Sequence, residues 1–181
     1  MKTKMTYSEV LAVNARNQPR KTLLAIMSKS AGLEGLVCVL EGVRKYYPNA
    51  DGESFPDVIN RYGAFLQVKG ICGGFNAKGY LNVKEAIESD YSNFIALSTL
   101  NKHGLHVYRV PVANMERLVE ANIFRLTKGR YRVRQGLMKH HTLLRQQSDR
   151  YYKITESEAA DTFLKVQLKI NKVIADGRLV P

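Results

Sequence analysis

The sequence contains only two cysteines, Cys38 and Cys72, and this scarcity excludes both a disulfide framework and a four-cysteine zinc site. Two isolated thiols suit a reducing compartment, so we expect a cytoplasmic protein. The sequence also has no apolar run long enough to span a bilayer. Residues 1–6 are basic, but no apolar segment follows them, so we expect neither a secretory signal nor insertion into a membrane.

Acidic residues are scarce relative to basic ones, with 16 Asp and Glu against 28 Lys and Arg, which gives a net charge of +12. A surplus of this size favours a polyanionic partner, with nucleic acid first and an anionic membrane surface second. The apolar share of 45% is sufficient for a real core, and 181 residues correspond to one domain of ordinary size. We therefore expect residues 1–181 to form a single domain.

The chain is organised around the segment 54–70, which predicts a β-hairpin. Two apolar runs flank a turn at residues 60–63, where an Asn and a Gly favour chain reversal. Gln67 and Lys69 are two residues apart on the second strand and therefore share a face, while the residues that alternate with them point to the core. Pairing back through the turn brings Asp57 near Gln67. A carboxylate, an amide oxygen and an ammonium group together suit a divalent cation held against a phosphate.

The segments before the hairpin are predicted to be helical. Capping-box spacing starts a helix over residues 6–16, and a second helix follows Pro19. The main helix is expected over residues 31–47, because apolar residues recur there every three or four positions. Glu34 and Glu41 border this stripe; either they are solvated, or one of them reaches over the hairpin and joins the metal site. The stripe consists of Leu33, Leu36, Val37, Leu40 and Val43.

Beyond the hairpin, strands and helices alternate. Residues 94–100 and 105–110 are predicted to be buried strands joined by a turn at residues 101–104. Pro111 then opens a helix that ends near Ile123. This order predicts an α/β fold in which a mixed central β-sheet is flanked by helices, with a helical N-terminal segment and a basic C-terminal region.

Residues 125–153 carry a long run of basic side chains with a single acid. Residues 131–134 alternate as a strand or ribbon would, and arginine is suited to guanine edges while lysine mostly contacts phosphate. The alternative to DNA contact is a basic surface that is exposed only to solvent. The glycine-rich loop 70–79 is either mobile or in contact with DNA, and we expect His140 and His141 to face DNA or solvent rather than a metal. The candidate DNA-binding residues are Lys78, Lys102, His103, Arg130, Arg132, Arg134 and Lys139.

The last helix is predicted from a second capping box at residues 155–158, and Gly177 ends it. Its apolar stripe packs either on the sheet or on a second subunit. The stripe consists of Phe163, Val166, Ile170 and Val173.

Pro56 and Asp57, followed ten residues after the aspartate by Gln67-Val68-Lys69, resemble the motif of the PD-(D/E)xK nuclease superfamily. Gln67 replaces the usual acid, as in the Q-x-K variant of the motif. The resemblance is greatest to a short type II restriction endonuclease. It implies a restriction-endonuclease-like core over residues 31–123, preceded by a helical arm at residues 1–30 and followed by a basic DNA-contacting region and a C-terminal helix at residues 124–181.

The resemblance implies a Mg²⁺-dependent DNA endonuclease, with Mn²⁺ as a possible substitute. Asp57 would be the principal metal ligand, and Gln67 would offer its amide oxygen together with the backbone carbonyl of Val68. Lys69 would hold or polarise the attacking water and stabilise the charge that develops on the phosphate.

The neutral side chain of Gln67 leaves the site one negative charge short of the version with an acid. Metal binding should weaken unless another carboxylate compensates. Glu34, Glu41 and Glu53 are the candidates, and Glu53 lies four residues before Asp57, where it could also hold a second metal.

Three functions remain open on the sequence. The first is a site-specific restriction endonuclease that cuts duplex DNA as a homodimer, each subunit cleaving one strand. The second is a structure-selective nuclease for junction resolution, repair or transposition. The third is a basic DNA-binding protein without catalytic activity, in which the motif is accidental.

Overall fold

The computed structural model describes residues 19–28, 30–42, 45–46, 58–70, 93–127, 130–133 and 141–175. For residues 30–31, 45–46, 69–70, 124–127, 130–133 and 170–175 it describes the backbone alone. In chain order the elements are α2 (Arg20–Met27), α3 (Ser30–Glu41), β1 (Lys45–Tyr46), β2 (Val58–Ile59), β3 (Phe65–Gly70), β4 (Phe94–Asn101), β5 (Gly104–Pro111), α5 (Val112–Glu120), β6 (Phe124–Thr127), β7 (Arg130–Val133), α6 (His141–Gln147), β8 (Arg150–Ile154) and α7 (Ala159–Ala175).

Six of the strands form one mixed sheet in the order β1-β2-β3-β4-β5-β8. Neighbouring strands are antiparallel except β3 and β4, which run parallel. Strands β6 and β7 form a separate antiparallel ribbon. The predicted α/β fold with a mixed central sheet is therefore confirmed.

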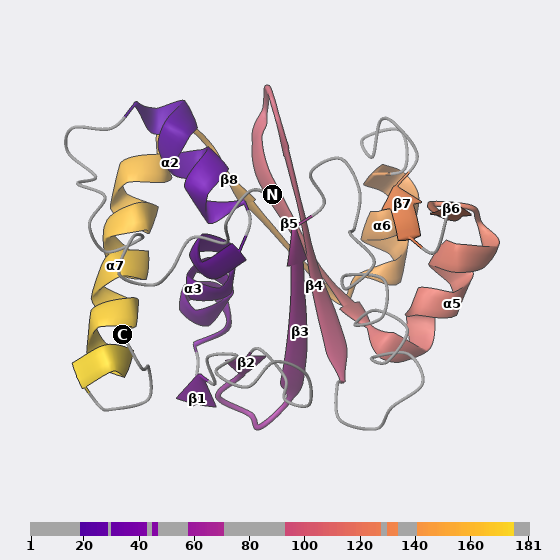
Figure 1. Ribbon diagram of the computed structural model, residues 1–181, viewed down its shortest axis with the longest axis horizontal. Helices are drawn as coiled ribbons and strands as arrows, with labels where there is room; N and C mark the ends of the chain where they lie inside the picture. The colour runs from indigo at the N-terminus through magenta and orange to yellow at the C-terminus, as the bar shows by residue number, and fades with distance from the viewer. Residues whose placement is uncertain are drawn as a thin grey trace.

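Helices cover both faces of the sheet (Figure 1). Helices α2, α3 and α7 lie on one side, whereas α5, α6 and the β6–β7 ribbon lie on the other. Each side has its own apolar core. The core under α2, α3 and α7 includes Leu24, Met27, Leu36, Val37, Leu66, Val68, Phe163 and Val166. The core under α5 and α6 includes Ile95, Leu97, Tyr108, Val110, Met115, Leu118, Ile123 and Leu144.

Strands β4 and β5 occupy the interior of the sheet, and this position explains their composition. Strand β5 is buried over all but its last residue, and β4 is buried over its central part, residues 95–99. A strand that is covered on both faces has apolar residues at successive positions rather than at alternating ones. The hairpin of β4 and β5 and the helix that begins after Pro111 are as predicted.

Helix α3 ends six residues earlier than predicted. The prediction of a helix over residues 31–47 is wrong beyond Glu41, and residues 45–46 form the edge strand β1 instead. Gly42 follows the last helical residue with φ +60, a left-handed conformation that glycine adopts without steric cost and that ends helices. The apolar repeat continues to Val43, which is why periodicity alone placed the end too late.

The C-terminal part of the chain belongs to the same sheet and core. Strand β8 pairs with β5, and α7 packs against α2 and α3 with Phe163 and Val166 fully buried. One half of the predicted capping box is confirmed, because the backbone N–H of Thr155 donates to Oε2 of Glu158 at 2.8 Å; the backbone N–H of Glu158 donates to the carbonyl of Thr155 instead of to its hydroxyl. The described part of the stripe on α7 therefore packs within its own chain.

Helices α2 and α3 meet at a tight corner, with an angle of 84° between them. A Cβ atom on Gly32 would lie 2.1 Å from the backbone oxygen of Ile26, so only glycine allows this approach. Among the described residues, no single helix has both the length and the apolar composition required to cross a membrane. The bent pair of α2 and α3 meets these two criteria only when both helices are counted together.

We predict that Gly32→Ala destabilises the protein by about 2–3 kcal/mol, because the new methyl group overlaps a backbone atom that cannot move aside easily. Gly63→Ala is the matched control. It has a φ of +85 but open space around the added Cβ, so it should cost only about 1 kcal/mol in backbone strain. Urea unfolding curves measure both free energies. Equal costs would contradict the close helix approach.

Candidate active site

The hairpin that carries the predicted site forms as expected in its described part. Strands β2 and β3 are joined by a turn in which the backbone N–H of Asn60 donates to the carbonyl of Ala64 at 2.9 Å. The side-chain Oδ1 of Asn60 accepts the backbone N–H groups of Tyr62 and Ala64 at 3.0 and 2.9 Å. Gly63 has a positive φ of 85. Asn60 thus closes the turn from the inside.

The strand register divides the residues of β3 between the two faces of the sheet. Leu66 and Val68 lie in the core under α3, so Gln67, which alternates with them, faces the opposite layer. Gln67 is in register with Ile95, which lies in the core under α5 and α6. Lys69 is placed by its backbone on the same face as Gln67.

Asp57 and Glu53 lie outside the described residues, so their approach to Gln67 stays a prediction. The described pairing between β2 and β3 matches Val58 with Leu66. One further residue of pairing in this register would set position 57 opposite Gln67. The register is thus the one that the predicted cluster requires.

The side chain of Gln67 is buried, with an exposed fraction of only 5%. Within the part of the chain that the structure describes, its amide group forms no hydrogen bond. Buried amide groups in proteins are nearly always hydrogen-bonded, so an amide without a partner is a candidate ligand for something outside the described chain. An amide oxygen beside a carboxylate and a main-chain carbonyl is a donor set that suits Mg²⁺.

No group of three or more His, Cys, Asp or Glu side chains is arranged to hold a metal among the described residues. A cation at Gln67 would therefore depend on residues outside the described ranges, of which Asp57 is the acidic residue nearest in sequence. The donor atoms of the predicted site suit Mg²⁺ chemically, and a complete site requires the carboxylate of Asp57.

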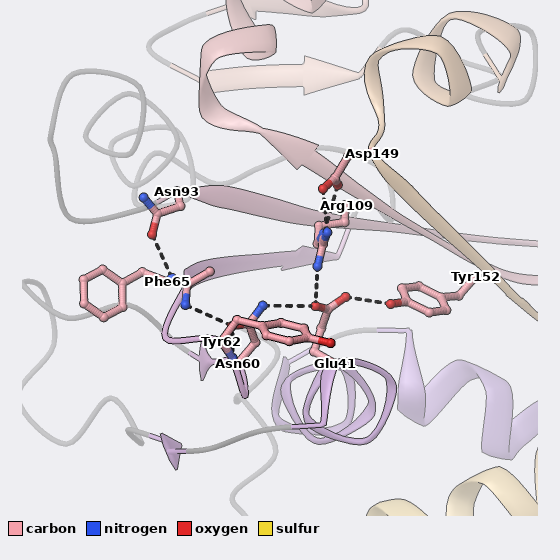
Figure 2. A network of polar contacts seen from close by, with 9 residues as sticks. Glu41, Asn60, Tyr62, Phe65, Asn93, Arg109, Asp149 and Tyr152 are labelled. Carbon is pink, nitrogen blue, oxygen red and sulfur yellow. Dashed lines mark hydrogen bonds and ion pairs between the residues drawn. The ribbon is translucent and has the colours of Figure 1, made fainter.

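Glu41 has a different partner from the one considered on the sequence. Its Oε2 accepts Nη1 of Arg109 at 2.6 Å and Nδ2 of Asn60 at 3.5 Å, while its Oε1 accepts the hydroxyl of Tyr152 at 2.8 Å (Figure 2). This network lies on the face of the sheet covered by α3, opposite to Gln67. Glu41 does reach the hairpin, but it reaches the turn residue Asn60. Glu34, partly buried on the same helix, belongs to the same layer.

Arg109 is held between two carboxylates. Besides Glu41, it donates from Nε and Nη2 to the two carboxylate oxygens of Asp149 at 2.9 and 2.5 Å. Its guanidinium carbon lies 4.6 Å from the ring centre of Phe94. The hydrogen bonds to Asp149, followed by those to Glu41, hold the pKa of Arg109 above its usual range. The single acid of the basic region 125–153 is thus the partner of a buried arginine.

Asn93 ties the start of β3 to the start of β4. Its Oδ1 accepts the backbone N–H of Phe65 at 3.0 Å, and its own N–H donates to the carbonyl of Phe65 at 3.0 Å (Figure 2). Its carbonyl accepts the N–H of Val112 at the start of α5. The hairpin is therefore anchored at both the turn and the first residue of β3.

A cluster of histidine and tyrosine side chains lies on the other face of the sheet. His106 is 3% exposed, with Nδ1 2.7 Å from the hydroxyl of Tyr151 and Nε2 3.1 Å from Oδ1 of Asn101. In the neutral ring, Nε2 donates to the amide oxygen and Nδ1 accepts from the phenol. Burial, followed by the nearby His141, Lys153 and His103, lowers the pKa of His106 to about 4.

The second pair of this cluster joins the hydroxyl of Tyr108 to Nδ1 of His141 at 2.7 Å. Burial raises the pKa of both Tyr108 and Tyr151. The expectation that His141 faces DNA or solvent is therefore wrong, because its ring is half-buried against Tyr108. His140 lies outside the described residues. The sequence analysis missed this cluster because His106 and Tyr108 stand among apolar residues in a segment that predicts a buried strand.

The predicted DNA-binding residues are only partly described. Lys102 and His103 are exposed in the turn between β4 and β5. Arg130 and Arg132 lie in the ribbon, where the register matches Arg132 with Arg125. The remaining candidates, Lys78, Arg134 and Lys139, lie outside the described residues.

Comparison of the chain with protein-family models, with curated proteins and with solved structures finds no match.

We predict that Glu41→Gln lowers the free energy of unfolding by about 3 kcal/mol, because it removes one charge of a buried ion pair and leaves Arg109 with a single carboxylate. The control is Asp149→Asn. The side chain of Asp149 is 34% exposed against 3% for Glu41, so solvent screens its loss and the cost should be about 1 kcal/mol or less. Urea unfolding at pH 7 compares them. A larger cost for Asp149→Asn would contradict the ranking.

We predict that stability falls as the pH is lowered from 6.5 to 4, in part because of His106. In this window the unfolded histidine binds a proton that the folded one excludes, so the contribution is complete above pH 6.5 and is lost toward pH 4. Its size is on the order of 2–3 kcal/mol. His106→Gln should flatten the slope of unfolding free energy against pH, while His103→Gln, at an exposed position, should leave it unchanged. Equal slopes in all three proteins would refute the assignment.

Proposed function

We propose that this protein is a metal-dependent DNA endonuclease of the PD-(D/E)xK type. The observation that carries the proposal is the placement of Gln67. Its buried amide forms no hydrogen bond among the described residues, it shares a face of β3 with the backbone position of Lys69, and the register of β2 leads toward Asp57. Asp57, Gln67 and Lys69 occupy the three positions of the Q-x-K variant of the nuclease motif.

The order of elements supports a restriction-endonuclease-like core. Helix α3, which carries Glu34 and Glu41, precedes a hairpin with the candidate residues, and further strands complete a mixed sheet flanked by helices. This is the arrangement that the resemblance to the superfamily implies over residues 31–123.

Hydrolysis of a phosphodiester requires an activated water and neutralisation of the charge that develops on the phosphate. A bound Mg²⁺ supplies that charge neutralisation. In the proposed site, the carboxylate of Asp57, the amide oxygen of Gln67 and the carbonyl of Val68 would hold the cation. The ammonium group of Lys69 would hold the attacking water by a hydrogen bond and stabilise the charge that develops on the phosphate.

The charge of the chain supports DNA as the substrate. A net charge of +12 attracts a polyanion, and the exposed Lys102 and His103 are available for phosphate contacts. Two-strand cleavage at a palindromic site requires a two-fold homodimer in which each subunit contributes one site. We therefore propose a restriction-type enzyme that acts on duplex DNA.

A second candidate is a DNA-binding protein without catalytic activity. The observation in its favour is that Glu41 is committed to Arg109 on the face opposite Gln67, so it cannot supply the missing negative charge. Under this function, DNA binds with a steep salt dependence and added Mg²⁺ changes nothing.

We predict that purified protein cleaves plasmid DNA in the presence of Mg²⁺ and that Asp57→Asn and Lys69→Ala each reduce the rate at least about 10²-fold, as expected for loss of a metal ligand or of a group that positions water. Gln67→Glu should retain cleavage and lower the Mg²⁺ concentration at half-maximal rate, because it adds a negative charge to the ligand set.

Asp161→Asn and Lys165→Ala on α7 remove the same types of charge from exposed positions and serve as controls for net charge. Discrete bands on a defined genome would support site specificity. Plasmid that stays intact with the wild-type protein, or is cut equally by the Asp57 and Lys69 variants, would leave the non-catalytic function.

A further inference from the structure

The turn between β2 and β3 presents an arginine and a tyrosine to solvent. The side chain of Tyr62 is 74% exposed, whereas the other large exposed apolar residues of the described chain, Leu164 and Leu168, are aliphatic and lie on α7. Arg61 is exposed beside it, with its guanidinium carbon 5.8 Å from the ring centre of Tyr62. Tyrosine and arginine are the residue types most enriched where proteins bind partners.

The backbone of this pair and the side chain of Arg61 are held in place. Asn60, which is 2% exposed, accepts the backbone N–H groups on both sides of the turn and donates to Glu41 beneath it (Figure 2). The guanidinium of Arg61 rests over Gly42, because a Cβ at that position would lie 2.5 Å from its Nη2. A preformed contact loses less conformational entropy on binding than a mobile one.

The chemistry of the pair identifies the kind of partner. Guanidinium and phenol hydroxyl groups both donate hydrogen bonds to phosphate oxygens. No acid stands among residues 58–70, and the chain as a whole carries a charge of +12. The pair therefore suits a polyanionic backbone better than a neutral or basic protein surface.

We propose that Arg61 and Tyr62 form a contact with the phosphate backbone of duplex DNA. The contact rests on the DNA-binding part of the proposed function and not on cleavage. Three residues of extended chain separate Ala64 from Gln67, which is roughly 10 Å. The turn would thus set the position of the duplex relative to the candidate active site.

The test is DNA binding without metal, measured by fluorescence anisotropy with a labelled duplex in EDTA over a range of salt concentrations. Arg61→Ala should weaken binding roughly 5- to 10-fold and reduce the slope of log K against log salt by about one phosphate contact. Tyr62→Ala should weaken binding about two- to fivefold with little change of slope, because it removes a neutral donor. Thermal unfolding by circular dichroism checks that each variant folds.

Arg117→Ala is the matched control, since it removes the same charge from an exposed position on α5. An unchanged salt slope in Arg61→Ala, or an equal change in Arg117→Ala, would overturn the proposal. If Arg61→Ala fails to fold, Tyr62→Ala decides, and wild-type affinity in that variant would indicate that the turn does not contact DNA. Because binding is measured in EDTA, absence of cleavage by the wild-type protein refutes the nuclease and leaves this contact intact.

Discussion

The burial of Arg109 is the constraint on which the rest of the arrangement depends. A guanidinium inside a protein loses much of its hydration, and the loss is offset only where carboxylates and hydrogen bonds surround it. Glu41 and Asp149 provide these from opposite ends of the chain, one from α3 and one from the loop before β8. Because both carboxylates bind Arg109, α3 is fixed above β5 and the start of β8 is held at the sheet. A well-packed apolar core alone would not specify these positions so narrowly.

The same network determines where the candidate active site can be. Glu41 extends from Arg109 to Asn60, and Asn60 closes the turn of the hairpin that carries Gln67. The residues that support the hairpin thus lie on one face of the sheet, while Gln67 emerges on the other. The Glu41 network and Gln67 therefore lie on opposite faces of the same sheet. Ligand groups on β3 are consequently supported from the face that α3 covers, while Gln67 itself is buried toward the layer of α5 and α6.

The sequence was informative where local rules act. The described part of the hairpin, residues 58–70, was predictable, as were the strands around residues 101–104 and the backbone hydrogen bond of the capping box at Thr155, because turn chemistry and apolar runs specify them. The end of α3 was missed because the apolar repeat outlasts the helix, and only Gly42 marks its end. The pairing of β8 with β5 and the Arg109 network were unpredictable, since they join residues 40 to 111 positions apart that no local pattern connects.

On the proposed function, glutamine at position 67 resolves a conflict between burial and metal binding. A carboxylate at a site only 5% exposed, next to Ile95 in the ladder, would be strongly disfavoured whenever no cation was bound. An amide offers the same oxygen to a cation at a much smaller desolvation cost, although it attracts the cation less strongly. The protein can then keep this face of β3 folded in the absence of metal. The weaker attraction leaves Asp57 to supply the charge, so the metal affinity of such a site is governed mainly by one residue.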